Sequence, residues 1–373
     1  MTLKVSWPQA LAWRLHRQLL VPVTRQSIPD VVRRLCGVQA QVASSADLAV
    51  RVRRKSSAPG DVNRALSDGR LIKTWAMRGT LHLLTPEDGG VFLSLLAAGR
   101  SWERPSWVSW FGLGPKEIEI LREVVRDALD GTVLSREELV AAVARHPALG
   151  HVGDALRSGW GTVLKPLAWQ GDLCFGPMRG SRVTFMRPDQ ASSRWAGVPD
   201  PDDAAPAAIV AYLGAYGPAT IENFGNFLAR GRISAKQQRA WFAAAGKRLV
   251  EVEVDGESAL ILAGDVEALA TAKPSNDVRL LPGFDQYVMG PGTDDRHVVP
   301  AARRSAVSKQ SGWIAPVVLL GGTVRGIWEL DGDAAHISWF REAGPAPRAA
   351  LGAEVARLAS ILARPLEADI QLV

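Results

Sequence analysis

At 373 residues the chain is too long for one ordinary domain, and its hydrophobic fraction of 47% is that of a globular protein. Its 44 Lys and Arg residues against 38 Asp and Glu residues give a formal charge of +6, which permits a polyanionic partner without requiring one. The sequence has no apolar signal core and no apolar run that could span a bilayer, so we expect a cytoplasmic protein that binds no membrane. The cysteines, Cys36 and Cys174, lie far apart in apolar surroundings, which favours buried thiols over a disulfide.

The sequence predicts that an order of three helices followed by a hairpin occurs three times. In the first repeat, Asp68-Gly69 ends the helices, and the hairpin turns near Arg78-Gly79 and ends at Pro86. The expected helices and strands of this repeat lie at residues 11–19, 31–36, 62–66, 71–76 and 80–84.

The second repeat contains a capping box, in which Ser135 and Glu138 open a helix. Its hairpin has a long tip at Gly176–Ser181, and a linker rich in proline and aspartate, residues 187–206, follows it. The expected elements lie at residues 118–129, 139–144, 159–169, 172–175 and 182–186.

The third repeat has the clearest signals, with Thr220 and Ser234 as helix N-caps and a tight hairpin turn at Asp255-Gly256. Beyond residue 274 we expect a three-stranded meander and a closing helix. The expected elements of the third repeat lie at residues 207–213, 220–228, 234–245, 249–254 and 258–262, and those of the tail at 317–320, 323–329, 336–340 and 349–362.

Three short helices followed by a two-stranded wing form the winged helix-turn-helix, which commonly binds DNA. We therefore expect an α+β fold of three tandem winged-helix units, at residues 1–98, 99–190 and 204–265, with a C-terminal β-rich segment at residues 275–373. Winged helices also serve as protein interaction modules, so the repeats alone leave the function open.

The most informative short motif is Gly37-Val38-Gln39-Ala40-Gln41. On a helix the two glutamines would point about 200° apart, so they face the same way only on extended or turned backbone. Gly37 falls at the C-terminal cap of a helix opened by Ser27 or Asp30, which predicts such a break. We therefore expect the two glutamines to be presented and not buried in a regular element.

Two glutamines limit the chemistry that such a site can perform. A glutamine amide cannot act as a strong base at neutral pH, but it can hold and orient a water molecule. Orientation alone can contribute about 7–11 kcal/mol, which suffices if the leaving group is already good. N7- or N3-alkylated purines meet this condition because the departing base is cationic. The alternative is that Gln39 and Gln41 only bond to backbone near the helix end.

Two further segments make the pattern specific. Trp75–Leu84 reads Trp-Ala-Met-Arg-Gly-Thr-Leu-His-Leu-Leu, and Leu281–Gly290 reads Leu-Pro-Gly-Phe-Asp-Gln-Tyr-Val-Met-Gly. Together with Gln39-Ala40-Gln41, and in this order, they resemble the AlkZ/YcaQ superfamily of winged-helix DNA glycosylases. The Gln-x-Gln form resembles the AlkZ branch, since the YcaQ branch would carry Asp at position 41.

The resemblance implies a monofunctional DNA glycosylase that excises bulky N-alkylated purines, such as those left by a DNA-damaging natural product, with self-resistance and crosslink unhooking as associated roles. Gln39 and Gln41 would position the water, and neither a cofactor nor lyase activity is expected. No Cys/His pattern predicts a metal site and no glycine-rich phosphate loop is present in the sequence. The expected partner is duplex DNA with alkylated purines, bound by a monomer.

Three residues are weaker candidates for contact with the lesion. Asp47 could stabilise the sugar cation, or it could cap a helix at residues 48–53. Thr80 and His82 share one strand face of the first hairpin. His82 either contacts the lesion or a phosphate, or is a half-buried structural histidine.

Several basic residues are candidates for contact with DNA phosphates, which would make affinity depend on salt. Trp102, Trp107 and Trp110 could stack on exposed bases or pack between two units. The candidate phosphate contacts are Arg51, Arg53, Arg54, Lys55, Arg78, Arg179, Arg182, Arg303 and Arg304.

Two other classes of function fit the repeats. A non-catalytic transcriptional regulator would read DNA through a recognition helix, for which residues 234–239 are the candidate, and would usually dimerise. A protein interaction scaffold would bind no DNA in a salt-dependent way.

Overall fold

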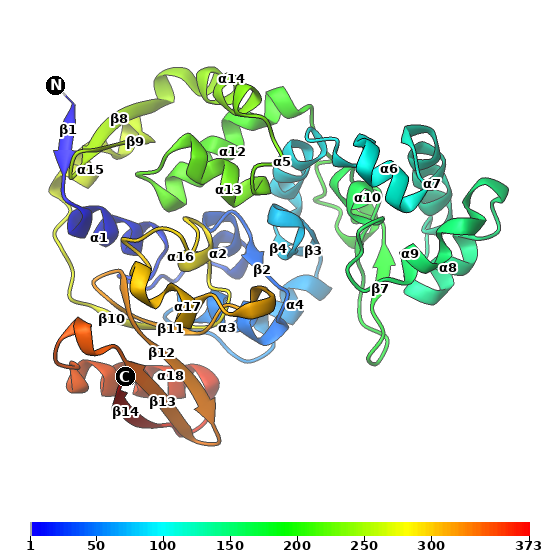
Figure 1. The fold of residues 1–373 in the computed structure, drawn as a ribbon. Coiled ribbons are helices and arrows are strands. Elements are labelled where there is room, and N and C mark those ends of the chain that lie inside the picture. Colours follow the sequence, from blue (N-terminus) through cyan, green and yellow to red (C-terminus); the bar gives the residue numbers. More distant parts are fainter. Residues whose placement is uncertain (1) are drawn as a thin grey trace. The chain divides into compact units, whose positions relative to one another are not determined.

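The structure is a computed structural model and describes residues 2–373. It has an α+β fold, as predicted, and divides into two compact units (Figure 1). The first unit runs up to Val62 and also contains Ile209–Phe227 and Ala245–Val373, and the second contains Asn63–Ala208 and Leu228–Ala244. The first unit is therefore built from three separate parts of the chain.

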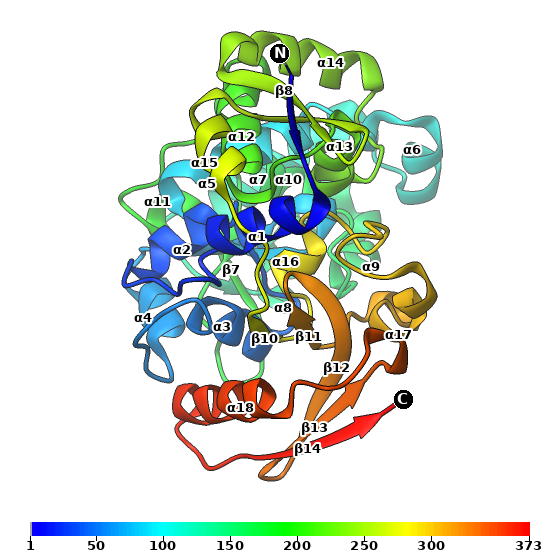
Figure 2. The ribbon, with the colours of Figure 1, turned by 90° about the vertical axis from the view of Figure 1, so that its left-hand side faces the viewer.

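A sheet of five strands forms the C-terminal part of the first unit, in the order β10-β11-β12-β13-β14. Neighbouring strands are antiparallel, except that β13 and β14 are parallel. Helix α18 (Arg348–Leu362) packs on β10 and β14 (Figure 2). The predicted three-stranded meander is thus the centre of a larger sheet. The strands at its two edges, β10 and β14, were not predicted. The strands are β10 (Val278–Leu281), β11 (Val317–Leu320), β12 (Thr323–Asp331), β13 (Ala334–Trp339) and β14 (Glu367–Leu372).

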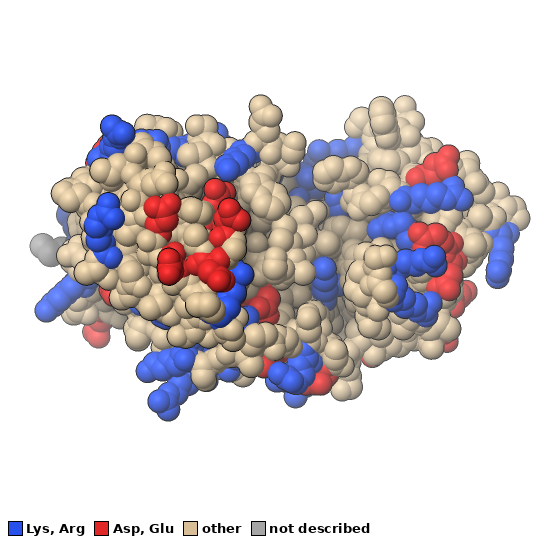
Figure 3. Space-filling model, turned by 90° about the horizontal axis from the view of Figure 1, so that it is seen from below, with Lys and Arg blue, Asp and Glu red and all other residues tan. Residues whose placement is uncertain are grey.

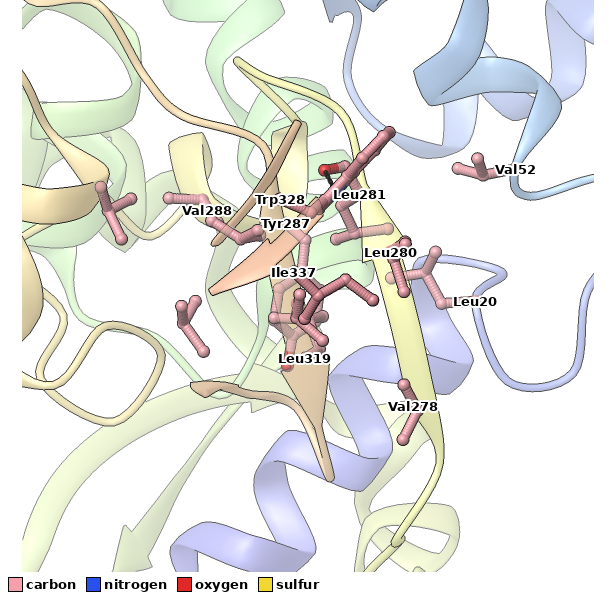
Figure 4. Close-up of a cluster of buried hydrophobic side chains, with 14 of the residues drawn as sticks. Leu20, Val52, Val278, Leu280, Leu281, Tyr287, Val288, Leu319, Trp328 and Ile337 are labelled. Atoms are coloured by element: carbon pink, nitrogen blue, oxygen red, sulfur yellow. Dashed lines mark hydrogen bonds between the residues drawn. The ribbon is translucent and has the colours of Figure 1, made fainter. Parts of the chain in front are cut away.

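The hydrophobic core of this unit joins the sheet to the N-terminal helices (Figure 4). Trp328 lies in it with its indole Nε1 donating to the Leu281 carbonyl at 2.8 Å, so its polar atom is satisfied. Leu11 and Leu15 enter the same core from α1 (Trp7–Arg17). Residues at the two ends of the sequence therefore share one core.

A second sheet of the first unit has the order β1-β8-β9. The hairpin of β8 (Leu249–Val254) and β9 (Glu257–Leu262) turns at Asp255 and Gly256, whose φ angles of 45° and 86° suit a tight two-residue turn, as predicted. Strand β1 (Leu3–Val5) pairs parallel to β8. This strand was not predicted, because three residues carry too little periodicity.

Helices of the third predicted repeat occur in the predicted order, but the first begins within the stretch that the sequence predicts as a linker. That stretch also contains the short helix α11 (Pro188–Ala191). The three helices of this repeat are α12 (Pro201–Tyr216), α13 (Ile221–Ala229) and α14 (Ala235–Ala245).

Further short helices lie near the N-terminus and around the strands of the C-terminal part. They are α2 (Ile28–Arg34), α3 (Ala43–Arg51), α4 (Asp61–Ser67), α15 (Val266–Thr271), α16 (Gln286–Met289) and α17 (Arg304–Val307).

The second unit contains strands in the order β4-β3-β6-β7-β5. The capping box is confirmed, because Ser135 accepts from the Glu138 N–H and Glu138 accepts from the Ser135 N–H. The helix predicted over residues 159–169 forms only at its end, as α10 (Lys165–Trp169), and α5 and α6 were not predicted. The strands are β3 (Ile72–Trp75), β4 (Leu81–Leu84), β5 (Leu134–Ser135), β6 (Cys174–Phe175) and β7 (Thr184–Met186), and the helices are α5 (Pro86–Ala97), α6 (Pro105–Phe111), α7 (Pro115–Ala128), α8 (Arg136–Val143) and α9 (Gly153–Arg157).

Candidate active site

The two glutamines follow α2 on non-helical backbone, as predicted. Ser27 caps this helix, and the chain leaves it through left-handed conformations at Cys36 and Gly37, with φ angles of 56° and 99°. Gln39 lies in the short strand β2 (Val38–Gln39) and is only 4% exposed, whereas Gln41 is exposed. The expectation that both side chains are presented is therefore correct for Gln41 and wrong for Gln39.

The loop that carries the glutamines is held by residues far away in the sequence. The Gln286 amide Nε2 donates to the Gly37 carbonyl at 2.8 Å, and the Tyr216 hydroxyl donates to the Leu35 carbonyl at 2.7 Å. A Cβ on Gly290 would lie 1.9 Å from the Tyr216 ring, so only glycine permits this packing. The segment that contains Gln286 and Gly290 therefore supports the backbone in front of Gln39.

Gln286 has a second feature of interest. It is fully buried, and within residues 2–373 its carbonyl Oε1 has no hydrogen-bond partner. A buried amide oxygen without a partner is costly and is often satisfied by an ordered water. The segment around Gln286 was recognised in the sequence, but no pattern in it gave this residue a role.

The prediction that Arg53 contacts a DNA phosphate is wrong, because its side chain is buried. Its guanidinium is completely buried and forms a two-pronged ion pair with Asp285, with both N–O distances at 2.7 Å. The remaining guanidinium hydrogens are donated to Gln18 and to the Ala49 carbonyl. All five donors are used inside the protein, so Arg53 has a structural role and does not reach a phosphate.

The basic residues next to Arg53 in the sequence differ in how exposed they are. Arg51 is also buried; it binds Asp47 at 3.0 Å and the Ile361 carbonyl, which corrects its assignment as an exposed phosphate contact. Asp47 lies inside α3, so it is not the predicted helix cap. Arg54 is partly exposed and bonds to the Gln26 carbonyl, while Lys55 is exposed.

In the second unit, Arg78 lies on the turn between β3 and β4 with a φ angle of 59° and is 7% exposed. Thr80 donates to the Met77 carbonyl at 3.1 Å. His82 is fully buried, and its Nδ1 lies 3.0 Å from the Thr80 carbonyl. Burial, with the nearby charge of Arg78, lowers the pKa of His82 to about 3, so the ring is neutral near pH 7 and does not offer a cation to a phosphate.

The tip between β6 and β7 projects from its strands (Figure 1). Arg179 and Arg182 are both exposed there, as a phosphate contact requires. Arg179 binds Glu138 at 3.0 Å across the surface. Arg303 and Arg304 of the first unit are also occupied by carboxylates, at 2.6 Å from Glu342 and 2.8 Å from Asp294.

Surface charge alone does not mark a DNA site. On the face shown in Figure 3, Lys and Arg side chains lie in separate groups, several of them beside Asp or Glu. Within residues 2–373 no cluster of three or more His, Cys, Asp or Glu side chains is arranged to hold a metal ion. None of the helices formed by these residues has the length and apolar character needed to cross a bilayer.

Comparison with known proteins shows which class of enzyme this chain belongs to. The model of the family described as DNA glycosylase AlkZ-like matches residues 32–361. The chain therefore belongs to the AlkZ-like DNA glycosylases, and the resemblance inferred from its motifs is confirmed.

A curated protein and a solved structure, both from Streptomyces sahachiroi, are similar to this chain. The chain is 48% identical over 358 residues to a curated protein described as an interstrand DNA cross-link repair glycosylase, with 96% of each chain covered. It is 46% identical to the solved structure of the DNA glycosylase AlkZ, with a TM-score of 0.96, and the match covers 99% of this chain and 100% of that one. The protein is thus a DNA glycosylase with the AlkZ fold.

Proposed function

We propose that this glycosylase hydrolyses the N-glycosidic bond of bulky N7- or N3-alkylated purines in duplex DNA, acting as a monomer. The observation that carries the proposal is the non-helical Gln39-Ala40-Gln41 segment, which directly follows backbone that Gln286 and Tyr216 hold. A relative described as a cross-link repair glycosylase supports a bulky substrate. The adduct of a DNA-alkylating natural product is a substrate of this kind, and its removal would protect a producing cell.

The glutamines would act by positioning a water molecule. Gln41 is exposed and can present its amide, while Gln39 is held in a buried strand and has little freedom. A cationic alkylpurine leaves without acid assistance, so the enzyme needs only to align the water against the sugar cation that forms. His82 of the second unit is buried and its pKa is lowered to about 3, so it is not a candidate for an acid near pH 7.

The first test is base release from duplexes that carry N7-methylguanine or a bulkier N7-alkylguanine. Gln39→Ala and Gln41→Ala should each slow single-turnover release at least about 100-fold, since orientation of the water contributes several kcal/mol. Duplex affinity should change little. Gln310→Ala is the matched control, because Gln310 is exposed and lies far from the motif in sequence. Near-full activity of the double variant would remove the mechanism.

Substrate charge gives an independent test of the same chemistry. The unaltered protein should release cationic alkylpurines and leave uracil, hypoxanthine and 8-oxoguanine in place, because these neutral bases leave poorly without an acid. Robust release of uracil would show that an acid is present and that the glutamines are not sufficient. Tight binding to a preferred sequence with no base release from any duplex would favour the transcriptional regulator instead.

A further inference from the structure

A pocket of about 590 Å³ lies within the second unit, away in sequence from the glutamine motif. Its walls combine positive charge with aromatic rings. Residues of α6, of α10 and of the stretch between α13 and α14 contribute to it. The basic residues are Arg104, Lys165 and Arg232, and the aromatic residues include Trp107, Trp110 and Phe111.

Two of the cations, Lys165 and Arg232, lie close together at the Gly79 turn. A Cβ placed on Gly79 would lie 3.4 Å from Nη1 of Arg232 and 3.7 Å from Nζ of Lys165, so both charges approach the same point of backbone. The Arg104 guanidinium donates to the backbone carbonyl of Arg232 at 3.1 Å, which ties the third basic residue to the same segment of the chain. Within residues 2–373 none of the three forms an ion pair with a carboxylate.

Electrostatics agrees with this geometry. Burial, and then the nearby charge of Arg232, lowers the pKa of Lys165. Burial and the charges of Arg104 and Arg230 lower the pKa of Arg232 in the same way. Like charges that repel one another and form no ion pair with a carboxylate are stabilised when an anion binds between them.

The aromatic side of the pocket is unusually open. Trp110 is 82% exposed, although a tryptophan usually buries most of its large apolar surface. The rings of Trp107 and Phe111 lie on the same short helix with their centroids 4.7 Å apart. An exposed indole beside a group of cations offers a stacking surface next to a phosphate site.

We propose that this pocket binds one unpaired nucleotide of DNA, with its phosphate held by Arg104, Lys165 and Arg232 and its base stacked on Trp110. An unpaired nucleotide is required because a base within a duplex does not expose its face for stacking. Such nucleotides occur at strand ends and where a bulky adduct displaces a neighbouring base. The inference rests on the proposed action on DNA and adds a binding site for a nucleotide other than the alkylated one.

The test uses a fluorescently labelled single-stranded oligothymidylate, whose binding to the full-length protein is followed by anisotropy over a range of salt concentrations. Trp110→Ala should weaken binding about 10-fold through the loss of one stacked base. Lys165→Gln and Arg232→Gln should each lower the salt slope by about 0.7, which is the value for one phosphate contact on a single strand.

Matched controls come from the same unit. Trp160 is 74% exposed and does not line the pocket, and Arg157 is exposed and pairs with Asp154 on its own helix. Trp160→Ala and Arg157→Gln should leave the affinity and the salt slope unchanged. Thermal unfolding of every variant shows whether the fold is retained.

Two outcomes would overturn the proposal. Equal losses from Trp110→Ala and Trp160→Ala would show that any exposed tryptophan has the same effect, and a loss from the cation variants without one from Trp110→Ala would reduce the pocket to a plain phosphate contact. Base release by the unaltered protein is measured in parallel. If release fails while the oligonucleotide binds at the pocket, the proposed reaction is wrong and the nucleotide site stands.

Discussion

Arg53 in the first unit and Arg179 in the second each bind a carboxylate, but the two pairs lie in opposite environments. Neither side chain of the Arg53–Asp285 pair has any exposed surface, whereas the side chains of Arg179 and Glu138 are 51% and 50% exposed. Water screens the second pair and can replace either partner, while nothing can replace Asp285. A buried arginine therefore belongs to the fold, and an exposed one remains available to a phosphate.

The buried pair also bears on the proposed catalytic loop. Asp285 accepts from Arg53 and from the Tyr287 N–H, and it directly precedes Gln286, which holds the Gly37 carbonyl. Phe284, just before it, adopts a φ angle of 61°, which is unusual for an aromatic residue. The ion pair thus fixes the turn at Phe284 and Asp285. The next residue, Gln286, supports the backbone that leads to the glutamines.

Breaking the buried pair should have the largest effect on stability. Asp285→Ala leaves the Arg53 charge buried without a carboxylate to neutralise it, which should lower the free energy of unfolding by about 3–5 kcal/mol in denaturant titrations. The control is Asp154→Ala, because Asp154 is 98% exposed and its pair with Arg157 should contribute nothing measurable.

A second variant protects this test against failure to fold. Arg53→Met combined with Asp285→Asn removes both charges, so the doubly changed protein should recover part of the lost stability. Wild-type stability of Asp285→Ala would show that the pair is not the support described above.

Sequence reasoning succeeded where the signal is local. The turns at Arg78-Gly79 and Asp255-Gly256 and the capping box at Ser135 depend on residues that lie within a few positions of one another. Strands β1, β10 and β14 were missed, because each is short or lies at a sheet edge and is fixed by a partner elsewhere in the chain.

The burial of Arg53 could not be predicted for the same reason. The carboxylate that pairs with it, Asp285, lies 232 positions further along the chain. A run of basic residues in a sequence usually faces solvent. The glutamine motif was found because its residues are adjacent and unusual in type. Its supports, Gln286 and Tyr216, belong to other segments and become visible only when those segments pack together.

His82 is a buried titratable group. Its effect on the free energy of unfolding should be smaller than that of the buried ion pair and larger than that of the exposed arginines. Its pKa in the folded protein is about 3, below the ordinary value of 6.5, so only the unfolded chain takes up this proton between these values. Stability should therefore fall as the pH drops below about 6.5, by about 1.4 kcal/mol between pH 7.5 and pH 5.5.

The measurement is the free energy of unfolding across this pH range. His82→Gln should lose this part of the pH dependence, whereas His151→Gln should keep it, because His151 is exposed. An identical pH dependence in the protein and in His82→Gln would mean that the buried ring does not titrate as described.

Removing the two exposed arginines of the hairpin tip should have the smallest effect on stability and its main effect on DNA binding. Replacing Arg179 and Arg182 with Ala should leave unfolding nearly unchanged, since both side chains are exposed. Duplex binding should weaken, and its salt slope should fall by up to about two, because each lost phosphate contact contributes about 0.9. Base release from saturated substrate should suffer less, and Arg157→Ala should change neither quantity.

Glu138 sharpens this last prediction, because it binds Arg179 and would compete with a DNA phosphate for it. Glu138→Gln keeps an oxygen to accept from the Ser135 N–H, so the helix cap is preserved while the competing charge is removed. If the hairpin contacts phosphates, this variant should bind duplex DNA more tightly than the unaltered protein, although Arg182 is unchanged. A salt slope that stays the same in the double alanine variant, together with unaltered binding by Glu138→Gln, would mean that the tip does not touch the DNA backbone. Exposure would then be a necessary property of a phosphate contact on this protein but not a sufficient one.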